Sequence, residues 1–467
     1  MKAAGIILTL RQDGRRWLQS VETGNRGAEA SAEPRLETMA SDGRPRLEAI
    51  ANPSLRREVI MRVNGSPLQS VYETIVRRAA NDVRLADGSR IEMAVETSHI
   101  RAGERQGEVR ELALTLLEGN LQQMFGLAES LLAAGDFTFS NTSSAVRGYL
   151  LAEQGSAEPP PMPRHALLVA LEPHQTTEQA ARDVLQECFV QIADNVRVVR
   201  MSDDAEGPHQ LRVGLRRLRS AFSTFAPALR SAETVRLNAE ARWLGQEVGR
   251  LRDLDVLALD IVAREANAHP DEPGFAVIAD ALNSRTSAER MRLRETLKGE
   301  RVTRFLFDLA RLVEMRGWLV PADFEQTQRL ALPAMDTALS ALAKRWKRAR
   351  RQARDLDTLD AEQRHELRKE LKKLRYAAEF LSSLFPGRRV EAFLKRLRKL
   401  QNMFGDLNDA DLVRVKIGEV VAPGNEIADG QRAAGWLVGA SLARAEFGWE
   451  RAASLWRDLE GTEPFWK

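Results

Sequence analysis

Residues 209–219 read His-Gln-Leu-Arg-Val-Gly-Leu-Arg-Arg-Leu-Arg, and residues 365–375 read His-Glu-Leu-Arg-Lys-Glu-Leu-Lys-Lys-Leu-Arg. The second stretch follows the first at an offset of 156 residues, and the same offset relates Arg242 to Arg398 and Asp253 to Asp409. Chance matches among leucine and arginine would not keep one register over so long a span. The sequence therefore predicts two copies of one helical unit.

Each copy separates its basic and apolar side chains onto different faces of a helix. At about 100° per residue, four basic positions fall within a stripe roughly 80° wide, and the leucines face another side. Arg217 and Lys373 project away from that stripe. The basic stripes comprise His209, Arg212, Arg216 and Arg219 in the first copy, and His365, Arg368, Lys372 and Arg375 in the second.

The repetition of the stripe indicates a function. Like charges three and four residues apart repel one another, and a single basic stripe is ordinarily a solvated face. A solvated face has no need to keep a histidine and its basic neighbours in register twice. We therefore expect the two helices to face each other, joined by Arg242 and Arg398, around an extended polyanion with repeated phosphates. Arginine offers paired donors to phosphate oxygens, and lysine a point charge.

Two further features of this half leave alternatives open. Asp253 and Asp255 form an acidic pair that recurs at residues 409 and 411. Such a pair is compatible with a metal ion, but pairing with the repeated arginines, which would orient them, is the favoured interpretation. The run Lys344–Arg351 is dense in lysine and arginine around one tryptophan. It is typical of a nucleic-acid contact, another wall of the anion site, or a solvated face.

Composition excludes several classes of protein. The 467 residues are 43% hydrophobic, enough for a sizeable core, and the net charge of only +3 is not that of a polycation. No apolar stretch is long enough to span a membrane, and the first ten residues are too quickly followed by charge for a signal peptide. Cys188 has no cysteine to pair with, and the histidines show no zinc pattern. We expect a reducing, cytoplasmic compartment.

The chain before residue 154 has a different residue pattern. Short alternating runs are separated by turn formers, with Asp87-Gly88 between residues 83–85 and 90–95 typical of a β-hairpin. Residues 112–117 favour a further strand, and residues 121–133 a helix. The Pro-rich stretch 154–162 reads as a linker. The predicted domains are an α+β region at 1–153, a linker at 154–164 and an all-α domain at 165–467, with repeat halves of about 165–320 and 321–467.

The doubled motif resembles the CHAD family, the conserved-histidine α-helical domain, over about residues 165–467. Residues 249–255, 405–410 and the closing Glu-Pro-Phe-Trp at 463–466 belong to the same likeness. The resemblance implies two pseudo-symmetric four-helix bundles and a basic cleft that binds inorganic polyphosphate. The implied polyphosphate-binding residues are His209, Arg212, Arg216, Arg217, Arg219, Arg242, His365, Arg368, Lys372, Lys373, Arg375 and Arg398.

Residues 1–153 are similar to part of a CYTH domain, the triphosphate tunnel fold, and imply a partial antiparallel β-barrel. Such enzymes hold a triphosphate with basic residues and a divalent metal with glutamates. This chain lacks the opening Glu-x-Glu-x-Lys strand, for which a truncated gene model would be one explanation. Arg11, Glu111 and Arg147 match the family pattern. The departures from it are Thr9, Glu22, Ala113, Thr115 and Ser144.

These observations predict a polyphosphate-binding protein that has lost triphosphatase activity, with no catalytic or metal-binding residues and no cofactor. Polyphosphate granules are a further expected partner, and a membrane is not. The alternative is a residual tri(poly)phosphatase that would need Mg²⁺ or Mn²⁺. The second alternative, nucleic-acid binding, is disfavoured because three tyrosines and 6% aromatic residues offer few platforms for stacking bases.

Overall fold

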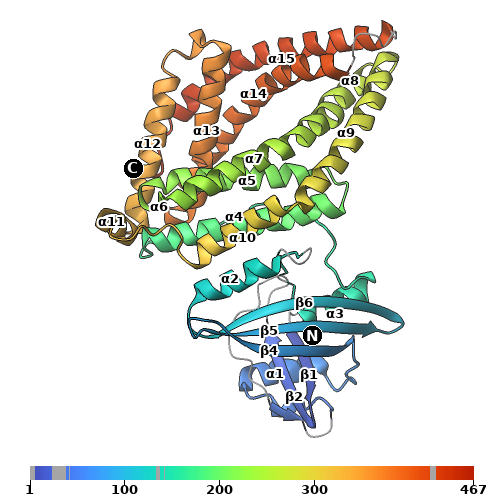
Figure 1. The fold of residues 1–467 in the computed structure, drawn as a ribbon. Helices are drawn as coiled ribbons and strands as arrows, with labels where there is room; N and C mark the ends of the chain where they lie inside the picture. Colours follow the sequence, from blue (N-terminus) through green and yellow to red (C-terminus); the bar gives the residue numbers. More distant parts are fainter. Residues whose placement is uncertain (1–5, 24–37, 41–42, 133–136, 141, 421–427) are drawn as a thin grey trace. The chain divides into compact units, whose positions relative to one another are not determined.

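The computed structural model describes residues 6–23, 38–40, 43–132, 137–140, 142–420 and 428–467. Its contacts divide the chain into two compact units. One comprises Met1–Met124 and Phe139–Pro160, and the other Phe125–Thr138 and Pro161–Lys467. The first unit holds the strands and the second most of the helices (Figure 1).

The strands of the first unit pair antiparallel into two three-stranded sheets, ordered β1-β2-β3 and β4-β5-β6. The predicted hairpin is confirmed: β4 and β5 meet at a tight turn in which Gly88 has φ +87°. Leu151 of α3 packs beside Ile100 in a small core against the second sheet. The elements of this unit are β1 (Ile6–Asp13), β2 (Arg16–Thr23), β3 (Thr38–Ala40), α1 (Pro53–Val63), β4 (Glu73–Arg84), β5 (Arg90–Ala102), β6 (Arg105–Glu118) and α3 (Ser144–Gln154).

The second unit is helical, as predicted. A segment with π-helical hydrogen bonding, Val256–Val262, interrupts the run between α7 and α8. The helices, some of which are labelled in Figure 1, are α4 (Thr177–Met201), α5 (Glu206–Thr224), α6 (Ala226–Leu229), α7 (Ala232–Asp255), α8 (Ala263–Ala268), α9 (Gly274–Lys298), α10 (Glu300–Glu314), α11 (Phe324–Ala331), α12 (Ala334–Gln352), α13 (Ala361–Leu381), α14 (Gly387–Val420) and α15 (Ala428–Glu460).

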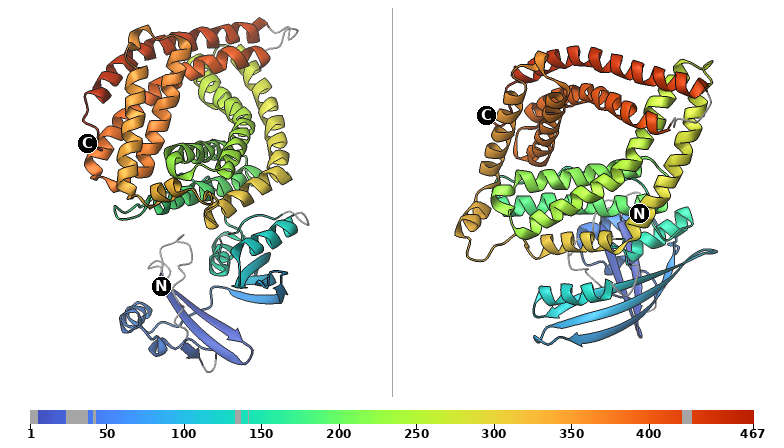
Figure 2. Two further views of the ribbon diagram at one scale, coloured as in Figure 1. Left: turned by 60° about the vertical axis from the view of Figure 1, so that its left-hand side comes forward. Right: turned by 45° about the horizontal axis from the view of Figure 1, so that its top comes forward.

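The two predicted repeat halves contact each other at both ends. At one end α4 and α5 pack against α12 and α13, and at the other α9 packs against α14 and α15 (Figure 2). Leucines of α5 and α13, such as Leu215 and Leu371, are buried in one core cluster that runs through both halves. A second cluster joins α9, the π-helical segment, α14 and α15. These apolar contacts set the orientation of α5 and α13, and with it that of their basic stripes.

Helix α2 (Leu121–Leu132), predicted from its spacing, contributes to the helical unit from Phe125 onward. The Phe125 ring meets that of Phe307 edge-on at 5.5 Å between centroids. Glu129 forms ion pairs with Arg304 and, at 3.3 Å, with Arg311. This part of the chain is therefore anchored to α10.

Candidate anion-binding site

The helices that carry the two basic stripes are positioned by their apolar faces. Leu211 and Leu218 of α5 are fully buried, as are Leu367 and Leu374 at the matching places of α13. Helix α13 begins with a capping box, in which Asp360 accepts a hydrogen bond from the backbone N–H of residue 363. With the leucines held in the core, the stripe residues of both helices are left on a different side.

In the first stripe, Arg212 is held in place by a carboxylate. Its Nη1 donates to Asp253 Oδ1 at 2.6 Å, and its guanidinium packs over the backbone of Gly249 in α7. Burial and the neighbouring Arg212 lower the pKa of Arg216. Burial and the charge of Arg252 lower the pKa of His209 at the start of the stripe. The interpretation that Asp253 pairs with a repeated arginine is confirmed.

The second stripe repeats this arrangement. Arg368 is mostly buried, and burial and the charge of Arg216 across the interface lower its pKa to about 10. Asp409, the repeat counterpart of Asp253, acts on it in the opposite direction. Arg375 lies 3.6 Å from Glu379. His365 is exposed, and its pKa is lowered by partial burial and by the positive charge of Lys369.

Lys372 has a strongly lowered pKa. Burial and the surrounding arginines lower its pKa to about 6. The arginines act on it from both helices: Arg216 and Arg212 from α5, and Arg368 and Arg375 from α13. Within the residues that the structure describes, no carboxylate forms an ion pair with its ammonium group. The basic stripes of α5 and α13 therefore lie close together, as expected, and positive charge is concentrated between the two helices.

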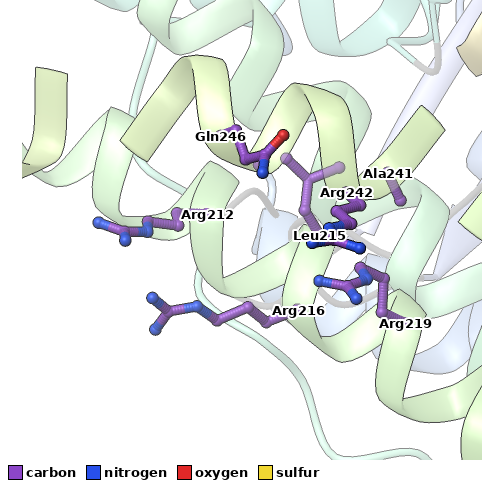
Figure 3. A pocket seen from close by; sticks show the side chains of 8 residues that line it. Arg212, Leu215, Arg216, Arg219, Ala241, Arg242 and Gln246 are labelled. Carbon is purple, nitrogen blue, oxygen red and sulfur yellow. The ribbon is translucent and has the colours of Figure 1, made fainter. Parts of the chain in front are cut away.

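Arg219, the last residue of the first stripe, lies close to Arg242 of α7. Together with Arg212 and Arg216 they line a cavity of about 210 Å³ between α5 and α7, here called the arginine pocket (Figure 3). Burial and the charge of Arg242 lower the pKa of Arg219. The sequence comparison did not single out two other lining residues, Gly245 and Gln246. Only the packing of α7 against α5 reveals them.

Two of the predicted residues lie apart from the site. Arg217 is 4% exposed, lies over the Phe380 ring at 4.9 Å and faces Glu379 at 4.0 Å, so it joins α5 to α13 from the core side. Lys373 turns toward Glu370 at 3.3 Å. Both departures follow the helical periodicity, which had already placed these positions away from the stripes. Arg398 is exposed on α14.

The basic run on α12 does not form one surface. Trp346 is buried against Phe393 and Trp456, so it offers no platform for a base. Arg345 is buried and donates to Glu370 at 3.1 Å. The remaining basic residues point outward, and Arg350 pairs with Glu460 at 2.8 Å. Packing within the core explains the aromatic residue and one arginine of this run.

The buried ion pair of Arg345 yields a stability prediction. Replacing Arg345 with alanine leaves the nearly buried Glu370 with only the more exposed Lys373 as a charged partner, and we expect unfolding to become easier by about 1.5–3 kcal/mol. Lys347→Ala on the exposed side of the same helix is the matched control, with an expected change within about 0.5 kcal/mol. Urea unfolding measures both. Equal midpoints for the two variants would contradict a structural role for Arg345.

Arginines engage both carboxylates of the first acidic pair. Asp253 is engaged by Arg212, and Asp255 turns into the core, where Arg290 donates to it at 3.4 Å. Among the residues described, no three histidine, cysteine or carboxylate side chains are grouped as metal ligands. Cys188 is fully buried, and burial raises the pKa of its thiol to about 12, which keeps it unreactive.

In the N-terminal unit, two of the three residues that match the tunnel-enzyme pattern, Glu111 and Arg147, contact each other. Arg147 is 4% exposed and donates to Glu111 at 3.0 Å, and it also pairs with Glu158. Ser140 donates a second hydrogen bond to Glu111 at 3.0 Å. The side chain of Glu22 lies outside the described residues. Both hydrogen bonds to Glu111 go to Oε1, and Glu111 is the one carboxylate left of three in this part of the family pattern, so β6 supplies too few oxygen ligands for Mg²⁺ or Mn²⁺.

Comparison with known proteins adds independent observations. A family model described as "CHAD domain" matches residues 183–416. The crystal structure of the CHAD domain from the plant Ricinus communis is similar, with a TM-score of 0.54 and 26% identity, over 65% of this chain and 98% of that one. An inorganic triphosphatase from Haemophilus influenzae is 36% identical over 89 residues, which is 19% of this chain. The chain spans about a quarter of that curated relative. No described helix is long and apolar enough to cross a membrane.

Proposed function

Because this chain belongs to the CHAD domain family, we propose that it binds inorganic polyphosphate through the facing basic stripes of α5 and α13. The observation that carries the proposal is the crowding of Lys372 by Arg212, Arg216, Arg368 and Arg375. Holding these charges together is unfavourable without an anion, since each lowers the pKa of its neighbours. A polymer with one negative charge at every phosphate would offset that repulsion at several positions at once.

The relatives support the same class of ligand. The inorganic triphosphatase similarity points to condensed phosphate chemistry, and it agrees with the predicted combination of CYTH-like and CHAD regions. Nucleic acid is a poorer fit, because Trp346 is buried in the core and cannot stack on a base. On this proposal polyphosphate granules are the place where the protein would gather.

A direct titration tests the proposal. Full-length protein is mixed with polyphosphate of defined lengths at several salt concentrations, and binding is followed by calorimetry. We expect tight binding that weakens steeply with salt, because phosphate contacts release counterions. RNA at equal phosphate concentration should fail to displace the polymer. Absence of binding at low salt, or ready displacement by RNA, would refute the proposal.

We further propose that the N-terminal sheets do not hydrolyse triphosphate. Glu111 is held by Arg147 and Ser140, and Ala113 and Thr115 stand on β6 where the family pattern has carboxylates. With tripolyphosphate and either Mg²⁺ or Mn²⁺, we expect phosphate release no faster than from the metal and substrate alone. Multiple turnovers, lost in Glu111→Ala but kept in a charge-reversed α5 variant, would show instead that this unit is an active enzyme.

A further inference from the structure

The two repeat copies differ at several positions that line the arginine pocket, and Gly245 is one of them. Gly245 of α7 lines the pocket, and a Cβ built on it would have nothing within 4 Å. The space beside it is therefore open. Glycine in the interior of a helix is less favourable than alanine, and no close neighbour here requires it. The absence of a side chain keeps this part of the pocket free.

The second copy fills the corresponding place. At the repeat offset, Gly245 becomes Gln401, which is 8% exposed in α14. Its Nε2 donates to the backbone oxygen of Leu371 at 2.8 Å. Leu371 is the repeat counterpart of Leu215, which lines the arginine pocket. The glutamine thus contacts the residue that would border a second pocket.

The two copies also differ in the partner of the last arginine of each stripe. In the second copy, Arg375 has Glu379 at 3.6 Å, whereas Ser223 stands at the matching place of the first copy. Among the described residues, the side-chain partner of Arg219 in the first copy is the neutral amide oxygen of Asn238, at 3.4 Å. At the Arg219 end of its stripe, the first copy therefore combines open space with a positive charge that lacks the carboxylate present in the second copy.

Building on the proposed function, we propose that the arginine pocket of the first repeat receives the terminal phosphate group of a polyphosphate chain, and that Gln401 closes the equivalent place in the second repeat. A terminal phosphate carries up to two negative charges, whereas an internal one carries one. The four guanidinium groups that line the pocket are matched to the group of highest charge, which they can contact through paired donors. The polymer is then anchored by one end, and the second repeat holds internal phosphates.

The test compares an anion that has ends with one that has none. Linear tripolyphosphate and cyclic trimetaphosphate are titrated into wild-type protein, Gly245→Gln and Gly245→Ala. We expect one linear chain per protein and at least tenfold tighter binding of the linear form. Gly245→Gln, which copies the second repeat, should reduce that preference at least fivefold, and Gly245→Ala should keep it within twofold.

Titration with long-chain polyphosphate distinguishes a failure of the terminal-phosphate site from a failure of the proposed function on which it rests. Gly245→Gln should bind the long chain within about fivefold of wild type, because the internal contacts remain. An unchanged linear preference in Gly245→Gln, two tripolyphosphates per wild-type protein, or no binding of tripolyphosphate would overturn the terminal-phosphate site. Failure of wild type to bind the long chain would overturn the proposed function itself.

Discussion

Replacing Arg212, Arg216, Arg368 and Lys372 together with glutamate is expected to lower the affinity for long-chain polyphosphate by at least about 1,000-fold. Hydrogen bonds to charged groups contribute about 1.5–3 kcal/mol each, and about 1.4 kcal/mol corresponds to a factor of ten. The free energies of the four lost contacts do not simply add, so a roughly 1,000-fold loss of affinity is the minimum that we expect. The slope of log affinity against log salt should also flatten by roughly three, since about four phosphates lose their partners.

The chain offers a control with the same change in charge. Lys344, Lys347, Arg348 and Arg351 are exposed on α12. Reversing all four alters the formal net charge as much as the site variant does. Because screening at physiological salt acts over about 8 Å, we expect this variant to bind within about tenfold of wild type. Circular dichroism and urea unfolding establish that both variants are folded. Equal losses of affinity in the two variants would show that binding depends on the overall charge of the protein and not on the facing stripes.

Polyphosphate binding is also expected to consume protons. In the free protein the pKa of Lys372 is about 6, so the side chain is mainly neutral at pH 8. A bound polyanion favours the charged form and raises this pKa toward its ordinary value of about 10.4. Binding at pH 8 should therefore take up as much as one proton. Affinity should fall with rising pH, by up to about tenfold per unit between pH 6 and the pKa of the complex.

Calorimetry in two buffers with different ionisation enthalpies measures the uptake directly. Long chains are used because their few terminal phosphates contribute little titration of their own. His209 and His365 also have lowered pKa values in the free protein, and a bound polyanion raises these as well, so the measurements are made at pH 8 and above, well beyond the ordinary histidine pKa of about 6.5. Lys372→Met should take up no proton in that range and should lose the pH dependence. Proton uptake by the methionine variant equal to that of wild type would exclude Lys372 as the titrating group.

The positions of the helices and of their basic faces were accessible from residue patterns. The repeat offset linked His209 to His365 and Asp253 to Asp409 without any coordinates. Helical periodicity separated the stripe residues from the leucines, because a helix in water must bury one face. The same periodicity excluded Arg217 from the stripe, and its burial over Phe380 agrees with that. These are properties of single helices and of their comparison, so a linear pattern is sufficient.

Other features depended on which helices meet. A tryptophan within a basic run is compatible with stacking on a base or on a core, and only the packing of Trp346 against Phe393 decides between them. The strongly lowered pKa of Lys372 arises first from its burial and then from nearby arginines, of which Arg212 and Arg216 lie more than 150 residues away in the chain. The opening at Gly245 likewise exists only between α7 and α5. Sequence alone established the repeat, the helices and their charged faces, since these follow from local periodicity. Tertiary structure decided how strongly the charges interact, because burial and distance between helices set that energy.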